Sequence, residues 1–155
     1  MPEGFPAHDC FMQEALQEAR QALYTQDVPV GAVVVVDGTT IGRGRNSREA
    51  LADPTAHAEV MALRDAAQHL GNWHLTTATL YVTLEPCIMC VGAAVLSRIQ
   101  QLVFGCRDPK AGACGSQFDI LGAGRLNHTF PVVAGVCQQQ ASALLSEFFQ
   151  ALRRR

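Results

Sequence analysis

The chain has 155 residues, of which 48% are hydrophobic and 17% charged, and its formal net charge is -2. This is the size of one domain with a core of its own, and it carries too few charges for a disordered or coiled-coil protein. No apolar run approaches the ~20 residues of a membrane span, and the slight acidity disfavours a protein coated in nucleic acid while leaving local basic patches open.

Apolar spacing, β-branched runs and turn residues predict an alternation of helices and strands along the whole chain. In chain order they are a helix over 9–23 capped by Asp9, strands over 30–36 and 40–44 joined by Asp37-Gly38, a helix from Asp53-Pro54 to about Leu70, a strand over 79–84, a helix over 87–97, a strand over 101–105, a loop over 108–115, a strand over 132–136 and a helix over 139–152. No repeat or linker interrupts them. We therefore expect an α/β layered fold with one domain over residues 1–155.

Residues 1–4 lack the basic and apolar regions of a secretory signal, so we expect a cytoplasmic protein without a membrane segment. That setting disfavours disulfides among the six cysteines, which stand at 10, 87, 90, 106, 114 and 137. Four of them are scattered among apolar neighbours and are expected to act as small core residues. Only Cys87 and Cys90 form a spaced pair, and they need another explanation.

The pair opens a predicted helix, where a spacing of three puts both thiols on one face. Exposed N–H groups and the helix dipole favour thiolates in that first turn. His57 stands in a similar position at the start of the preceding helix. Two thiolates and one imidazole are the three protein ligands of a catalytic zinc site, in which the fourth position is left for water.

Glu59 follows His57 by two residues, so on a helix it points to a different side. At a helix N-terminus both side chains still reach a point above the first turn. A carboxylate there lies beside the metal's water without being a ligand, as a proton shuttle requires.

Other interpretations of the cysteine pair are a redox pair, half of a structural zinc site, or two core cysteines. Nothing else in the chain suggests a thioredoxin-like context for a redox pair. A structural site needs a fourth ligand, and none of the remaining histidines, at 8, 69, 74 and 128, stands close to another ligand residue. The two segments together favour the catalytic site.

Five segments resemble the bacterial tRNA-specific adenosine deaminases, within the zinc-dependent cytidine and deoxycytidylate deaminase superfamily. They are VPVGA (28–32), DPTAHAE (53–59), TLEPCIMC (83–90), DPKAGACGS (108–116) and LLSEFF (144–149). Arg48 stands where a smaller residue is expected, Pro109 and Cys114 vary the 108–116 loop, and the tail after residue 152 is short.

The resemblance implies a three-layer α/β/α cytidine-deaminase-like fold with a mixed sheet of about five strands. It makes His57, Cys87 and Cys90 the ligands of one Zn²⁺ per chain and Glu59 the general acid/base. It further implies that a zinc-bound hydroxide would attack C6 of the wobble adenosine (position 34) of a tRNA anticodon and leave inosine.

It also implies contacts between the splayed anticodon loop and a homodimer. The residues expected to meet the base or its neighbours are Asn46, Ala58, Asp108, Lys110, Phe149 and Arg153. Four of them have a plainer interpretation: Asn46 as a strand end, Asp108 as a turn, Phe149 as part of a core stripe and Arg153 as part of a solvated tail.

Three functional alternatives stay open at this point. The first is a small-molecule deaminase of the same superfamily acting on cytosine, guanine or a nucleotide, since the zinc ligands are shared. The second is a non-catalytic zinc-binding RNA module, against which Glu59 argues. The third is an α/β domain whose cysteines all lie in the core.

Overall fold

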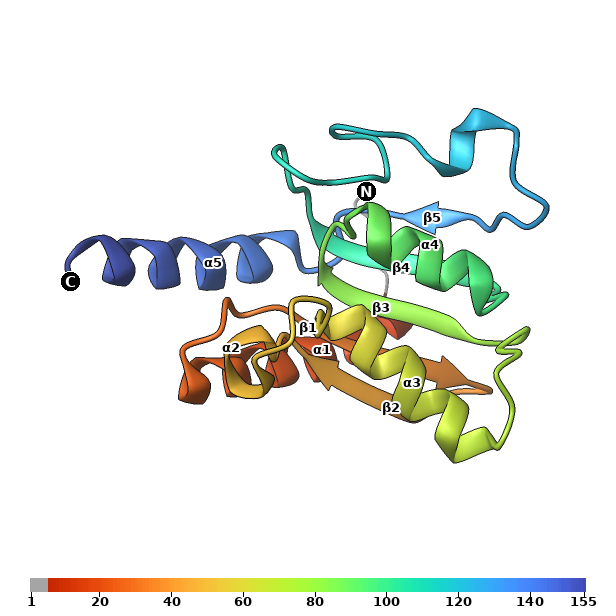
Figure 1. The fold of residues 1–155 in the computed structure, drawn as a ribbon, viewed down its shortest axis with the longest axis horizontal. Coiled ribbons are helices and arrows are strands. Elements are labelled where there is room, and N and C mark those ends of the chain that lie inside the picture. The colour runs from red at the N-terminus through yellow and green to blue at the C-terminus, as the bar shows by residue number, and fades with distance from the viewer. Residues whose placement is uncertain (1–5) are drawn as a thin grey trace.

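The computed structural model describes residues 6–155, arranged around one five-stranded sheet in the order β2-β1-β3-β4-β5 (Figure 1). The strands are β1 (Gly31–Val36), β2 (Thr39–Arg45), β3 (Thr79–Leu84), β4 (Gln101–Cys106) and β5 (Val132–Val133). The helices are α1 (Pro6–Ala22), α2 (Arg48–Leu51), α3 (Ala58–Leu70), α4 (Ile88–Leu96) and α5 (Gln138–Arg153), with short 3-10 turns η1 (Leu23–Thr25) and η2 (Leu121–Ala123).

The sheet is mixed because of how its strands are connected. β1 and β2 form a hairpin whose turn, Asp37-Gly38, has positive φ at both residues, as a tight two-residue turn requires. β1 is antiparallel to β3 as well, whereas β3, β4 and β5 run parallel. The crossover through α4 makes β3 and β4 parallel and returns the chain to the same edge.

Alternation along the strands produces two core layers, one on each face of the sheet. Ala32, Leu80 and Phe104 point toward α3 and α4, while Val33, Tyr81 and Val103 point toward α1 and the first half of α5. The rest of α5 extends beyond the sheet, with the C-terminus at its far end (Figure 1). This confirms the predicted α/β/α fold with five strands, and β1 is covered on both faces as its apolar sequence predicts.

Helix α3, which begins at the site, lies unusually close to β2. A Cβ added at Gly42 would lie 2.5 Å from the carbonyl oxygen of Ala62, and one at Gly44 would lie 2.4 Å from that of Ala58. Only glycine allows two backbones to approach so closely. These two positions therefore set the depth at which the start of α3 lies.

Three element boundaries differ from the prediction. Helix α1 begins before Asp9, which lies inside it and does not cap it. The segment after Asp53 is a turn, because the Asp53 carboxylate accepts hydrogen bonds from the Thr55 amide (2.8 Å) and hydroxyl, and α3 begins only at Ala58. Strand β5 ends at Val133, since the chain turns at Gly135, whose φ is 89°.

All six cysteines are free. Cys106 is buried, but Cys10 is exposed, so the expectation that it lies in the core is wrong: it sits on the outer side of α1. No helix within residues 6–155 is long and apolar enough to cross a membrane. Residues 1–4, on which the expectation of a cytoplasmic protein was based, lie outside the described residues.

Candidate active site

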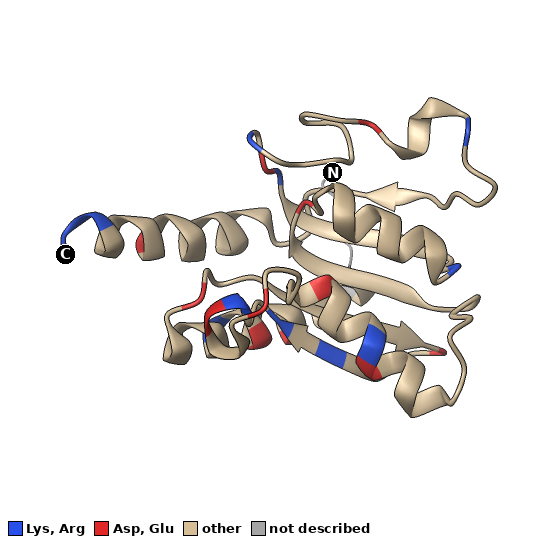
Figure 2. Ribbon diagram, viewed as in Figure 1, with Lys and Arg blue, Asp and Glu red and all other residues tan. Residues whose placement is uncertain are grey.

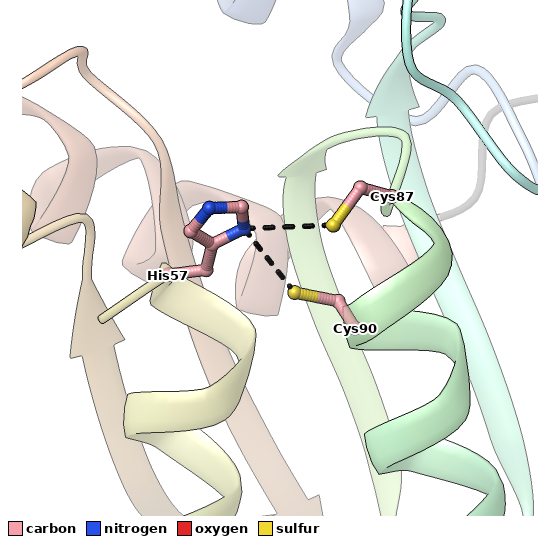
Figure 3. Close-up of side chains that lie close together, drawn as sticks. All are labelled: His57, Cys87 and Cys90. Carbon is pink, nitrogen blue, oxygen red and sulfur yellow. Dashed lines mark hydrogen bonds between the residues drawn. The ribbon is translucent and has the colours of Figure 1, made fainter. Parts of the chain in front are cut away.

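Three side chains meet where α3 and α4 begin, at the carboxyl end of β3 (Figure 3). His57 is the N-cap of α3, with φ -75° and ψ 152°. Cys87 is the N-cap of α4, with φ -79° and ψ 178°, and Cys90 lies in the first turn of that helix. Because both helices cover the same face of the sheet, their N-termini lie next to each other and aim their positive dipole ends at one place.

The distances between these side chains fit a tetrahedral metal. His57 Nδ1 lies 3.6 Å from Cys87 Sγ and 3.5 Å from Cys90 Sγ, and all three ligand atoms lie within 4.8 Å of one another. Zinc bonded to nitrogen at about 2.05 Å and to sulfur at about 2.3 Å, with tetrahedral angles, separates the two atoms by about 3.6 Å. No other cluster of this kind occurs among residues 6–155.

The electrostatics of the cluster also suit a cation. A hydrogen bond with Cys90 lowers the pKa of the Cys87 thiol, and the same bond together with burial raises the pKa of Cys90. The pair therefore holds one thiolate readily and shares its remaining proton. The hydrogen bond with Cys87 raises the pKa of the His57 imidazole. This proton-sharing set is ready to exchange its protons for a metal ion.

Glu59, the second residue of α3, is 4% exposed. Burial raises the pKa of its carboxyl to about 7, and the Cys90 thiol is its hydrogen-bond partner. No Lys or Arg forms an ion pair with it among the described residues. A carboxyl that can hold or release a proton near neutral pH is suited to general acid/base chemistry.

His57, Glu59 and Cys87 line one cavity of about 230 Å³. Its volume lies below the ~300–1,000 Å³ of pockets for drug-sized ligands, so it suits a single planar ring better than a whole nucleotide. Apolar side chains contribute to its lining, namely Val28, Val30 and Leu84.

The cavity has two polar edges built from different parts of the chain. Asn46 and Arg48 line it from the segment after β2, and Asp108 and Ala111 line it from the loop after β4. The Asn46 amide is fixed on both sides, since its Nδ2 donates to the Val28 carbonyl (3.1 Å) and its Oδ1 accepts from the Arg48 amide (3.3 Å). One N–H and one lone pair remain available to a ligand.

The substrate residues suggested by the sequence divide into two groups. Asn46, Ala58 and Asp108 line the cavity. Lys110 is exposed on the loop beyond it, and Phe149 and Arg153 lie exposed on α5. Phe149 lines a second hollow of about 360 Å³, which shares Val28, Asn46 and Arg48 with the first, so the two hollows adjoin.

Two charged residues that line the cavity, Arg48 and Glu85, were not among the site residues predicted from the sequence. Arg48, noted there only as a departure, lines the cavity. Glu85 lines it as well and is 2% exposed. Burial raises the pKa of the Glu85 carboxyl, but hydrogen bonds from Ser116, Asp108 and Cys114 outweigh that effect and lower it. The only signal for Glu85 in the sequence was its place directly after the predicted strand 79–84, two residues before Cys87.

The fold and the paired helix starts carrying His57, Cys87 and Cys90 are those of a deaminase, with three side chains placed where they could hold a metal ion. The sequence model of the MafB19-like deaminases matches residues 7–153, and the chain belongs to this family. A tRNA-specific adenosine deaminase of Bacillus subtilis is 46% identical over 95% of this chain and 91% of its own length.

Solved structures agree with that placement. A structure from a study of tRNA:A34 deaminases has a TM-score of 0.85 and 42% identity, covering 88% of this chain and 99% of its own. A guanine deaminase from Nitrosomonas europaea has a TM-score of 0.80 and 25% identity, covering 96% of this chain and 86% of its own. The chain is thus a member of the tRNA-specific adenosine deaminases.

Proposed function

We propose that this enzyme hydrolyses adenosine to inosine and ammonia at the wobble position, residue 34, of a tRNA anticodon. The observation that carries the proposal is the end-to-end similarity to tRNA-specific adenosine deaminases in a chain whose His57, Cys87 and Glu59 line one base-sized cavity. Because its proposed tRNA substrate is present in the cytoplasm, we propose that the enzyme acts there.

His57, Cys87 and Cys90 are the ligands that would hold one Zn²⁺ per chain. Their N–S separations of 3.6 and 3.5 Å and their two thiols favour zinc over oxygen-preferring cations. When bound, zinc lowers the pKa of water toward neutrality and so supplies a nucleophile for C6 of adenine.

Glu59 carries the protons in this proposal. Its carboxylate takes a proton from the attacking water and delivers it to the ring nitrogen N1. It then moves the second proton to the amino group at C6, which leaves as ammonia while the C6–O bond becomes the carbonyl of inosine. In the metal-free protein, burial raises the pKa of this carboxyl to about 7.

The cavity holds the base, and its surroundings hold the RNA. Asn46 offers one amide N–H and one lone pair to the base or sugar, and Ala58 and Asp108 border the same space. Lys110, Phe149 and Arg153 lie on the exposed rim, where cations meet phosphates and an aromatic ring stacks on a neighbouring base.

We also propose that two copies pair through the outer face of α4. That helix carries no charged residue (Figure 2), and Leu96 and Ile88 on it are 71% and 54% exposed. Such an uncovered apolar face is typical of a homodimer interface. Leu96→Glu should convert the dimer to a monomer in sedimentation velocity, whereas Leu70→Glu, an equally apolar exposed site on α3, should leave it a dimer.

The decisive test is deamination of an anticodon stem-loop carrying adenosine at the wobble position, alongside free guanine, cytosine and adenosine. Inosine formed only in the stem-loop supports the proposal. Conversion of free guanine alone would establish the alternative, a free-base deaminase, which the likeness to the Nitrosomonas europaea enzyme keeps worth testing.

A further inference from the structure

The Glu85 carboxylate is buried and accepts four hydrogen bonds from one loop. Its Oε1 accepts from the Asp108 amide at 3.0 Å and from the Ser116 hydroxyl. Its Oε2 accepts from the amides of Cys114 at 3.0 Å and Ser116 at 3.1 Å. The donors come from the first and last parts of residues 108–116, so a single side chain closes that loop.

The loop is folded closely around this carboxylate. A Cβ added at Gly112 would lie 2.3–2.5 Å from the three carboxylate atoms, so the chain there passes directly over them. The Arg107 guanidinium lies 3.9 Å from Oε1 and is largely exposed, which leaves the backbone amides as the main partners. Residues 108–116 form no helix or strand of their own. Carbonyl groups accept from some of their amides, as in the bond from the Gly112 amide to the Asp108 carbonyl at 2.9 Å, and the Glu85 carboxylate accepts from the amides of 108, 114 and 116.

The segment 85–87 connects loop 108–116 to the proposed metal ligands. Glu85 precedes Cys87 by two residues, and the carbonyl of the intervening Pro86 accepts from the Ala113 amide at 2.8 Å. On the other side, the Asp108 carboxylate accepts from the amides of Lys110 and Ala111. One chain of contacts therefore runs from the helix start that carries the thiols to the polar edge of the cavity.

We propose that Glu85 is a positioning residue that sets loop 108–116, and with it Asp108 and Ala111, at a fixed place against the metal-ligand segment. This rests on the proposed function, in which that loop faces the anticodon. Glu85 is no second proton shuttle, because both of its oxygens are occupied by donors of the loop. Its effect is on how well the RNA is held.

The test is Glu85→Gln in the full-length, metal-loaded enzyme. The amide nitrogen that replaces one oxygen cannot accept from a backbone N–H, so at least one end of the loop is released. We expect KM for the stem-loop to rise by about 10- to 100-fold, the scale of one or two lost hydrogen bonds to a charged group, with kcat changed less than about threefold. Metal content should stay at one ion per chain.

Two further variants grade the effect. Ser116→Ala removes the hydroxyl donor and should raise KM by roughly a few-fold. Glu85→Asp keeps the charge on a shorter side chain and should recover part of the loss seen in Glu85→Gln. Glu18→Gln is the matched control: Glu18 is also buried, at 8% exposed, and its partner Arg45 lies outside the cavity. That variant should leave KM and kcat unchanged.

A fall in kcat at unchanged KM, loss of the metal, or unchanged kinetics in Glu85→Gln would each overturn the positioning role. If wild-type protein deaminates no RNA, the proposed function fails and this inference is tested by hydrogen exchange. The amides of residues 108, 114 and 116 should then exchange faster in Glu85→Gln than in wild type, and equal rates would reject the role. If Glu85→Gln does not fold, Ser116→Ala carries both measurements.

Discussion

His57 Nδ1 and Cys90 Sγ lie 3.5 Å apart although 33 positions separate the two residues in the chain. The imidazole stands at the start of α3 and the thiol in the first turn of α4, so their distance measures how the two helices pack on one face of the sheet. With only three side chains in this candidate ligand set, we expect metal binding to require each of them.

We expect Cys90→Ser to reduce the zinc content from one ion per chain to a small fraction of one, because a neutral hydroxyl is a poor substitute for a thiolate. Elemental analysis of the purified protein measures this. Cys106→Ser is the control, since Cys106 is buried but bonds only to the Thr83 carbonyl. Full metal retention in Cys90→Ser would contradict the assigned ligand set.

Glu59→Ala should lower the rate of deamination by about 10²–10⁴-fold, the contribution of a positioned acid/base group, while zinc and RNA binding persist. Zinc and RNA binding must be measured together with the rate, because loss of zinc in this variant would point to a structural role for the carboxyl. Single-turnover assays with a wobble-adenosine stem-loop measure the rate, and gel-shift titration measures RNA binding. Near-normal turnover in this variant would show that another group moves the protons.

The buried Glu59 carboxyl predicts a pH-dependent stability of the metal-free protein. The folded state holds its proton up to a pKa of about 7, whereas the ordinary value is 4.5, so the folded state binds more protons between these values. The free energy of unfolding contributed by this group therefore falls as the pH rises through that window.

Glu59→Gln removes this titration. Metal-free Glu59→Gln should be more stable than wild type by about 1–3 kcal/mol at pH 8, with the difference disappearing near pH 4.5. Urea denaturation at the two pH values measures it. An equal difference at both would mean that packing, and not ionisation, separates the two proteins.

Asp27 holds the other polar edge of the cavity. It is 1% exposed and accepts hydrogen bonds from the amides of Glu49 (2.6 Å) and Ala50 (3.3 Å), at the start of the short helix α2 that carries Arg48. Asp27→Asn should lower the free energy of unfolding by about 1–3 kcal/mol, since the nitrogen that replaces one of the two oxygens cannot accept from the amide it faces. Chemical denaturation measures the change.

Asp119→Asn is the matched variant for that experiment. The Asp119 carboxylate also accepts from a backbone amide, that of Gly122 at 3.1 Å, but it is exposed. We expect a change within about 0.5 kcal/mol, because water replaces the lost bond. Similar losses at both positions would show that burial is not what makes the Asp27 contact strong.

Local patterns in the sequence predicted the elements well wherever the deciding interaction lies within a few residues. The Asp37-Gly38 hairpin and the apolar strands β1 and β3 are of this kind. Where a side chain competes with the backbone, prediction failed: Asp53 was expected to begin a helix, but its carboxylate bonds to Thr55 and α3 begins four residues after Pro54. Helix α2 was missed because the acid at its start, Asp27, lies 22 positions away from Glu49.

The sequence by itself predicted a metal site with two sulfur ligands, because the spacing of Cys87 and Cys90 places both thiols on one side of a helix start. The segments around them also resemble one family of deaminases. The structure brings His57, the histidine that the sequence had already singled out, to 3.6 and 3.5 Å from the two thiols, and only the structure decided what surrounds the cavity. Those outcomes depend on α3 and α4 packing side by side, and on Glu85 reaching a loop 23 to 31 positions further along the chain. Contacts over such separations are set by packing, which no local pattern encodes.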